Sequence, residues 1–211
     1  MTPSRHHPDP ATIMSFAAGS LPEPFSVVVA AHMALCRPCA RALRLHEDIG
    51  AELLDALAGA PLSGRTPHPL AAGGPDKPRG AVGDAVATPL DRLLANPLAE
   101  VAWRRLGVGI WHVRLPLADS TGGDLRLLKI GPGRLMPEHG HGGSEMTLVL
   151  SGAYADVHGR FGRGDIEEMD ETGEHRPHAD AATGCICLIA SARPARFKGL
   201  VSRLLQPLTG M

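Results

Sequence analysis

Three side chains able to bind a metal lie close together near the start of the chain. They are His32, Cys36 and Cys39, in the stretch AHMALCRPCARALRLHED, and only two other cysteines occur in the 211 residues. These positions would share one face of a continuous helix, but Pro38 would remove a hydrogen bond and kink that helix. We therefore expect one helix to end near Leu35 and another to begin at Pro38, with both thiolates at the junction. Such a set suits tetrahedral Zn²⁺, which needs a fourth ligand.

Three histidines are candidates for this fourth ligand: His6, His7 and His46. His46 lies two turns after Cys39 on the same helical face. His6 lies on a separate segment, and ligands from separate segments allow a metal to hold a small domain together. We therefore predict His6. The alternative is that both cysteines are small buried core residues and His32 is a core histidine. A thioredoxin-like redox role would need a strand before the motif, in a βαβ pattern.

A second group of potential ligands lies in GPGRLMPEHGHGGSEMTLVLSG. His139 and His141 are two residues apart, so in an extended segment they point to the same face. Glu145 opens the next apolar run and can meet them across the turn. A later segment, GRGDIEEMDETGEHRPH, adds His175, with His178 as a near alternative. Three imidazoles and a carboxylate suit a first-row divalent metal.

The residues around the first group predict a small helical unit. Asp9 is a good N-cap, Pro10 suits the first helical position and Gly19 is a plausible stop. A second, mostly apolar helix runs through PFSVVVAAHMAL, and a third follows Pro38 with apolar residues at helical spacing as far as Leu57.

The second half of the chain has a different sequence pattern. Short β-leaning runs (GIWHVRLPL, DLRLLKI, EMTLVLS, GCICLIA and ARFKGL) recur at intervals of about ten residues, which indicates an antiparallel sandwich or barrel. Between the halves lies a stretch rich in Pro, Gly and Ala. We therefore predict a helical domain over 1–60, a linker over 61–88 and a β domain over 89–211, an α+β multidomain chain.

Composition narrows the function. The formal charge is −1, aromatic residues make up 3%, and no basic run exceeds two residues, so we expect no direct nucleic-acid partner. No apolar stretch is long enough to span a membrane, and the N-terminus lacks a secretory signal. We expect a cytoplasmic protein, in which close-set cysteines indicate metal ligands or a redox switch instead of a disulfide.

These motifs carry a family resemblance. The segment from Gly133 to Gly152 matches the first cupin motif at each fixed position, and the segment from Gly164 to His175 matches the second in part, with Asp170 where cupins usually have Pro. A helical HxxxCxxC unit joined to a cupin barrel or jelly roll resembles the ChrR-type zinc-binding anti-sigma factors. The resemblance extends to WRRLGVGI after the linker and CICLIA near the end.

The resemblance implies a partner and a signal. The N-terminal domain would bind and inhibit an extracytoplasmic-function-type sigma factor in a 1:1 complex, and the cupin domain would release it under singlet-oxygen or organic-hydroperoxide stress. Two zinc sites are implied, one held by His6, His32, Cys36 and Cys39, the other by His139, His141, Glu145 and His175. The fourth helix that also grips sigma in this family has no convincing counterpart in residues 61–88.

The remaining candidates and the competing function complete the predictions. Cys185 and Cys187 face the same way on a predicted strand, either as small core residues or as an oxidant-sensitive pair. His68, His112 and His158 are expected on the surface or in loops. The competing function is a metal-dependent cupin dioxygenase or isomerase with a helical dimerisation module, but the HxxxCxxC unit is superfluous for that chemistry. We therefore expect a regulator and no catalytic residues.

Overall fold

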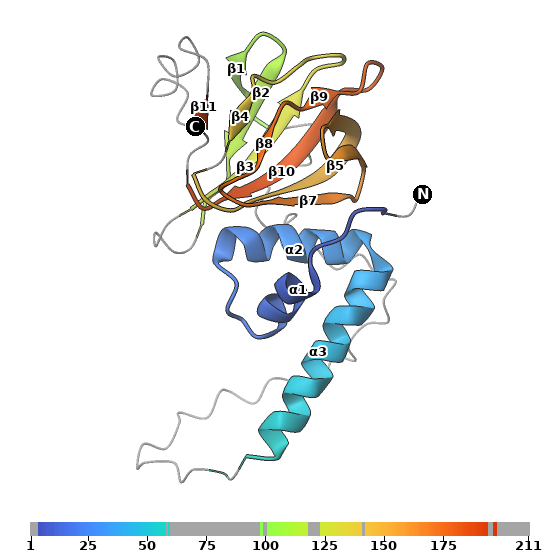
Figure 1. Ribbon diagram of the computed structural model, residues 1–211, viewed down its shortest axis with the longest axis vertical. Coiled ribbons are helices and arrows are strands. Elements are labelled where there is room, and N and C mark those ends of the chain that lie inside the picture. The colour runs from blue at the N-terminus through green and yellow to red at the C-terminus, as the bar shows by residue number, and fades with distance from the viewer. Residues whose placement is uncertain are drawn as a thin grey trace.

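Three helices precede an antiparallel β structure in the computed structural model, which describes residues 4–57, 59, 98, 101–117, 123–140 and 142–193, with the backbone of 196–197. The helices are α1 (Pro10–Ala17), α2 (Glu23–Leu35) and α3 (Arg37–Asp55). Helix α2 lies against the β structure, and α3 runs away from it (Figure 1). No helix among these residues is long and apolar enough to cross a membrane.

Local chemistry sets the helix boundaries. The Asp9 carboxylate accepts the Ala11 N–H at 2.8 Å and so caps α1, as expected. Helix α2 ends at Leu35 and α3 begins at Arg37, which leaves Cys36 between them in an extended conformation (φ −119°, ψ 100°). Pro38 occupies the first turn of α3, where its missing N–H costs no helical hydrogen bond. The predicted break between the two helices is confirmed.

The strands form two antiparallel sheets. One sheet has the order β1-β2-β3-β10-β5-β6, with β7 and β9 also paired to β5, and the other has the order β11-β4-β8. Together they make the antiparallel barrel that lies above the helices in Figure 1. The expected antiparallel barrel is confirmed. The strands are β1 (Arg104–Gly107), β2 (Ile110–Arg114), β3 (Asp124–Ile130), β4 (His139–Gly140), β5 (Glu145–Asp156), β6 (Gly159–Gly162), β7 (Ile166–Met169), β8 (Glu174–His175), β9 (His178–Ala179), β10 (Cys185–Ser191) and β11 (Arg196–Phe197).

The helices and the barrel share one hydrophobic core. Phe25, Val28 and Val29 of α2 are buried in the same cluster as apolar side chains of β3, β5 and β10, which include Leu127 and Leu188. A helix that is buried on one side by a sheet and on the other by helices is apolar nearly all round, which accounts for the composition of α2. The predicted linker, residues 61–88 with His68, lies outside the described residues, so the domain boundaries stay predictions.

Candidate functional site

The first cluster of potential ligands lies where α2 meets α3. His7, His32, Cys36 and Cys39 each offer one ligand atom, and these atoms all lie within 4.8 Å of one another. The His7 Nδ1 is 3.4 Å from the Cys36 Sγ and 3.3 Å from the Cys39 Sγ. A tetrahedral Zn²⁺ with bonds of about 2.0–2.3 Å separates its ligand atoms by about 3.3–3.8 Å. The spacing therefore suits a cation of this kind.

The structure corrects one residue of this cluster. The fourth member is His7 instead of the predicted His6, whose ring packs against Phe161 with centroids 4.4 Å apart. Residues 4–9 have no helix or strand of their own, and adjacent side chains in such a segment point in different directions. His46, the other candidate, lies along α3 outside the group.

Two buried groups of this cluster, the His32 Nε2 and the Cys39 thiol, are suited to binding a cation. The His32 Nδ1 donates to the Gly164 carbonyl at 2.9 Å, which leaves the Nε2 as the acceptor, and that atom is buried without a hydrogen-bond partner. Burial lowers the pKa of His32 to about 4, so the ring stays neutral. Burial and the neighbouring Cys36 raise the pKa of Cys39 to about 12, so without a cation this thiol stays protonated. A metal would satisfy the orphaned Nε2 and displace the thiol proton.

The second cluster lies inside the barrel. His139 of β4 and His175 of β8 face each other directly across the strand pair, and Glu145 at the start of β5 completes a group within 4.8 Å. The Glu145 carboxylate also accepts from the Ser191 hydroxyl at 2.9 Å, which fixes its direction. The structure thus brings together three of the four predicted ligands. The fourth, His141, lies outside the described residues.

The two barrel imidazoles are arranged as metal ligands. The His139 Nδ1 donates to the Pro137 carbonyl at 2.9 Å, and the His175 Nδ1 donates to the Asp156 carboxylate at 2.8 Å. In neutral rings both Nε2 atoms are then acceptors, yet they lie only 3.2 Å apart. Two lone pairs at this distance repel each other unless a proton or a cation lies between them. A divalent cation resolves this conflict and preserves both outer hydrogen bonds.

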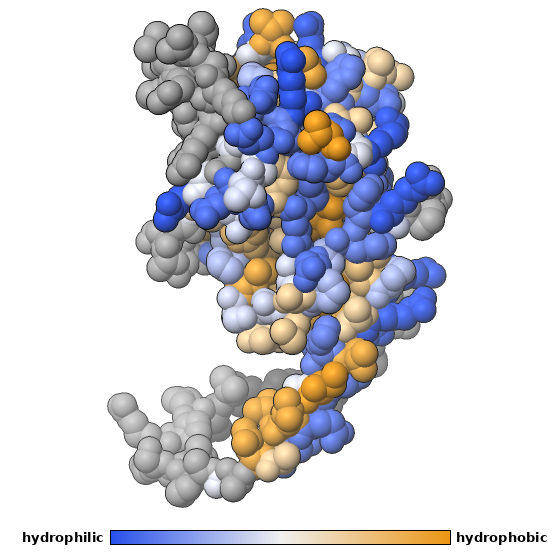
Figure 2. All heavy atoms as spheres, viewed as in Figure 1, coloured by the Kyte–Doolittle hydropathy of each residue, from blue (hydrophilic) through white to orange (hydrophobic). Residues whose placement is uncertain are grey.

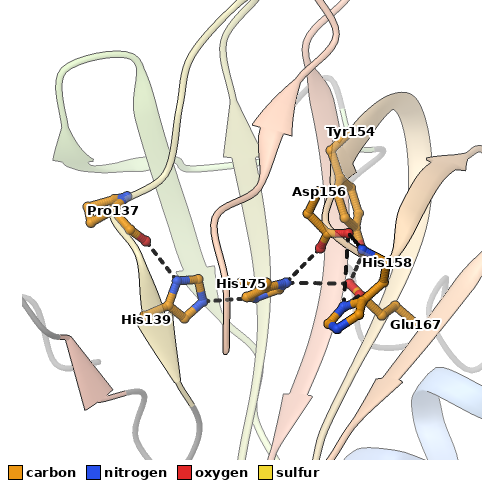
Figure 3. A network of polar contacts seen from close by, with 7 residues as sticks. All are labelled: Pro137, His139, Tyr154, Asp156, His158, Glu167 and His175. Carbon is orange, nitrogen blue, oxygen red and sulfur yellow. Dashed lines mark hydrogen bonds and ion pairs between the residues drawn. The ribbon is translucent and has the colours of Figure 1, made fainter. Parts of the chain in front are cut away.

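A network of polar side chains contacts His175 on the side that faces away from His139 (Figure 3). The Tyr154 hydroxyl donates to Glu167 at 2.6 Å, and the His158 Nδ1 lies 2.9 Å from the other Glu167 oxygen. Burial alone would raise the pKa of Asp156, but hydrogen bonds from His175 and from the His158 backbone outweigh it and lower this pKa. Asp156 is therefore an ionised acceptor that orients the His175 ring.

The barrel cavity is small. It has a volume of about 40 Å³ and is lined by His139, Glu145 and His175 together with mainly apolar side chains. A water needs roughly 10–15 Å³ of such volume, so the cavity has room for an ion and one or two waters.

Comparison with known proteins identifies the family of this chain. The model of the ChrR cupin-like domain matches residues 93–193. The anti-sigma-E factor ChrR of Cereibacter sphaeroides is 37% identical over 219 residues, which cover 96% of this chain and 97% of that protein. The chain belongs to the ChrR family of anti-sigma factors. A crystal structure of Rhodobacter sphaeroides SigE in complex with the anti-sigma ChrR superimposes with a TM-score of 0.75 at 38% identity, covering 89% of this chain and 99% of that one.

Membership of the ChrR family confirms the predicted resemblance and the class of protein, a regulator instead of an enzyme. It also explains why one chain contains both a cluster of Cys and His side chains on its helices and a cupin-like barrel.

Cys185 and Cys187, the possible redox pair, are both buried in the apolar interior of the barrel of this ChrR-family chain. The neighbouring Cys185 and burial raise the pKa of Cys187, so this thiol is protonated at neutral pH. Cys187 nevertheless lines the barrel cavity beside the ligands. A redox role stays a prediction, and only an oxidant small enough to enter the cavity would reach this thiol.

The residues that sequence reasoning missed are Tyr154, Asp156 and Glu167. His158 lies exposed in the β5–β6 turn, as expected for a surface or loop residue, and its ring also contacts Glu167 of this buried network. Tyr154 and Asp156 are two apart on β5 and so share a face, which is the one local signal of the network. Glu167 comes from β7, and no spacing along the chain relates it to them.

Proposed function

We propose that this chain is a zinc-dependent anti-sigma factor that binds an extracytoplasmic-function-type sigma factor in a 1:1 complex. In this proposal the helical unit holds sigma, and the barrel responds to singlet oxygen or organic hydroperoxides by releasing it. The named partner of the relative, SigE, supports the class of partner.

The observation that carries the proposal is the exposed apolar face of α3 and the residues just after it. Leu45, Ile49, Leu53 and Leu57 recur every four residues, so they form one ridge, and Leu54 extends it. Their side chains are 49–69% exposed. Figure 2 shows apolar atoms gathered along the half of α3 that extends away from the barrel. Such a ridge on a projecting helix is typical of a helix-mediated protein interface.

The N-terminal metal would set the direction of this ridge. Cys36 lies between α2 and α3, and Cys39 lies in the first turn of α3. A Zn²⁺ bound by these thiolates with His7 and His32 would hold the start of α3 against α2 and against the segment before α1. Among the described residues, the core cluster within the helical unit consists of Ile13, Cys36 and Cys39 with Met33, Ala42 and Leu43 packed against it. This is little apolar material to fix a 19-residue helix alone.

A second metal would occupy the barrel through His139, Glu145 and His175, with His141 as the proposed fourth ligand. There it would supply a fixed charge around which oxidisable side chains are arranged. His139 and His175 would hold it through their Nε2 atoms, and Asp156 would keep His175 in the required tautomer.

The test is a set of affinity measurements with recombinant sigma factors of this class from the source genome. Replacing Leu53 and Leu57 with Asp should weaken sigma binding by at least about 100-fold, because two apolar contacts of about 2 kcal/mol each are lost. Val108→Asp is the matched control, since Val108 is 67% exposed in the β1–β2 turn of the barrel. Equal affinities for the double variant and the control would refute binding through α3.

A further inference from the structure

Strand β7 and the turn before it lie between the two metal clusters. Successive side chains of a strand point to opposite faces. Within β7, Glu168 faces the segment that carries His7 and Glu167 faces the buried network beside His175. Asp165, in the turn just before the strand, also contacts the segment that carries His7. A single short stretch of the barrel therefore contacts the surroundings of both clusters.

On one side, β7 holds the backbone on both sides of His7. The N–H groups of Arg5 and His6 donate to the Asp165 carboxylate at 2.6 and 3.2 Å, and the Ile166 N–H donates to the His6 carbonyl at 3.2 Å. Beyond His7, the Asp9 N–H donates to Glu168 at 3.1 Å. The barrel thereby determines where the exposed ligand of the first cluster lies.

The same turn also orients the buried ligand His32. The carbonyl that accepts its Nδ1–H belongs to Gly164, which immediately precedes Asp165. Gly164 has a φ of +89°, and a Cβ added there would lie 2.7 Å from the Ser4 Oγ. The positive φ favours glycine at this position, and this backbone conformation directs the carbonyl toward His32.

On the other side, Glu167 contacts the surroundings of the barrel cluster. Its carboxylate accepts from Tyr154 and lies 2.9 Å from the His158 Nδ1 and 3.6 Å from the His175 Nδ1. A displacement of the His175 ring would therefore move Glu167, and its chain neighbours on β7 would move with it.

We propose that β7 couples the two metal clusters, with Gly164 and Asp165 as positioning residues of His32 and His7, and Glu167 as the contact to His175. This inference rests on the proposed function and names the route by which a change in the barrel reaches the sigma-binding helices. Because such coupling is reciprocal, each metal changes the affinity of the other site.

The test measures how fast iodoacetamide alkylates Cys36 and Cys39 in metal-loaded, full-length protein, read by peptide mass spectrometry. These two thiols report on the first cluster alone. His139→Ala removes a ligand of the barrel cluster, 25 residues before Gly164 in the sequence, and should accelerate their alkylation by about 5-fold or more. In an Asp165→Asn or a Glu167→Gln background, the further effect of His139→Ala should be about 2-fold or less.

A matched control separates coupling from general loosening. Asp170 follows β7 directly, and its carboxylate accepts from Thr172 in its own turn. In an Asp170→Asn background the full effect of His139→Ala should persist. A thermal melt identifies any variant that does not fold, and Glu167→Gln, which preserves the side-chain shape, carries the test if Asp165→Asn fails.

Two results would overturn the coupling: no acceleration by His139→Ala in the wild-type background, or an undiminished acceleration in either folded β7 variant. Sigma affinity measured on the same proteins separates this inference from the proposed function. Coupled alkylation without sigma binding refutes the function alone, and sigma binding without coupling refutes the route alone. Equal alkylation with and without zinc in the wild-type protein would overturn both.

Discussion

The two metal clusters differ in ligands, access and surroundings. The cluster at the α2–α3 junction combines two thiols with two imidazoles, and its His7 is exposed. The barrel cluster has imidazoles and a carboxylate around a cavity of about 40 Å³, with His139 and His175 only 7% and 5% exposed. Thiolates favour Zn²⁺, whereas a nitrogen and oxygen set accepts several first-row metals. This difference fits the proposed roles, in which metal at the first cluster would hold the helices together and metal at the barrel cluster would take part in the response to small oxidants.

The largest effect expected from this difference is loss of the first cluster. Replacing both Cys36 and Cys39 with Ser should remove one metal per chain and abolish sigma binding, because structural Zn²⁺ contributes about 10–16 kcal/mol to the folding of small zinc units. Metal analysis and a binding assay measure this. Cys185→Ala with Cys187→Ala is the matched control, since it removes two thiols elsewhere and should preserve this metal. A Cys36/Cys39 variant with full metal content would disprove the assignment.

A smaller and more local effect is expected in the barrel. His139→Ala should remove the barrel metal, since one of the two facing Nε2 atoms is lost, while zinc at the thiolate cluster remains. Element-resolved metal analysis of the purified variant measures both occupancies. If His139→Ala protein bound as much metal as wild type, the barrel cluster would not be a metal site.

The smallest effect is expected from Asp156, which accepts a hydrogen bond from His175. Asp156→Asn keeps the size of the side chain but removes the charged acceptor of the His175 Nδ1–H. We expect the barrel metal affinity to fall by about 10- to 100-fold, as is usual when the outer partner of a ligand histidine is changed. Competition with a chromogenic chelator measures this affinity. Asp170→Asn serves as the control, and equal affinities for both variants would exclude an orienting role for Asp156.

Most of the fold and both ligand groups could be predicted because their signals are local. The Asp9 cap, the break at Pro38 and the spacing of His139 and Glu145 each depend on residues close in sequence. The sequence favours His6, whereas the structure groups His7 with the cluster. Local signals could not show this, because it depends on which face of the segment meets the helices, and Asp165, some 160 residues away, helps to determine that face. The network of Tyr154 and Glu167 likewise exists only once β5 and β7 pair.

The packing of α2 on the barrel was not predicted either. The sequence pattern predicts that VVVAAHMAL is an apolar helix of an independent unit, whereas Val28 and Val29 lie in a core shared with β3, β5 and β10. A helix sequence reveals that it is buried but not which element buries it, since any apolar surface satisfies the same pattern.

The central claim, that zinc at the α2–α3 junction organises the sigma-binding surface, is tested most directly by sigma affinity at controlled metal content. In the His139→Ala variant the barrel cluster is disabled, so chelation acts on the metal of the first cluster, and affinities are compared within this one variant. Chelation should abolish its sigma binding, and Zn²⁺ should restore it while Mg²⁺, which prefers oxygen ligands, should not. Unchanged affinity in protein shown to be free of metal would contradict the account.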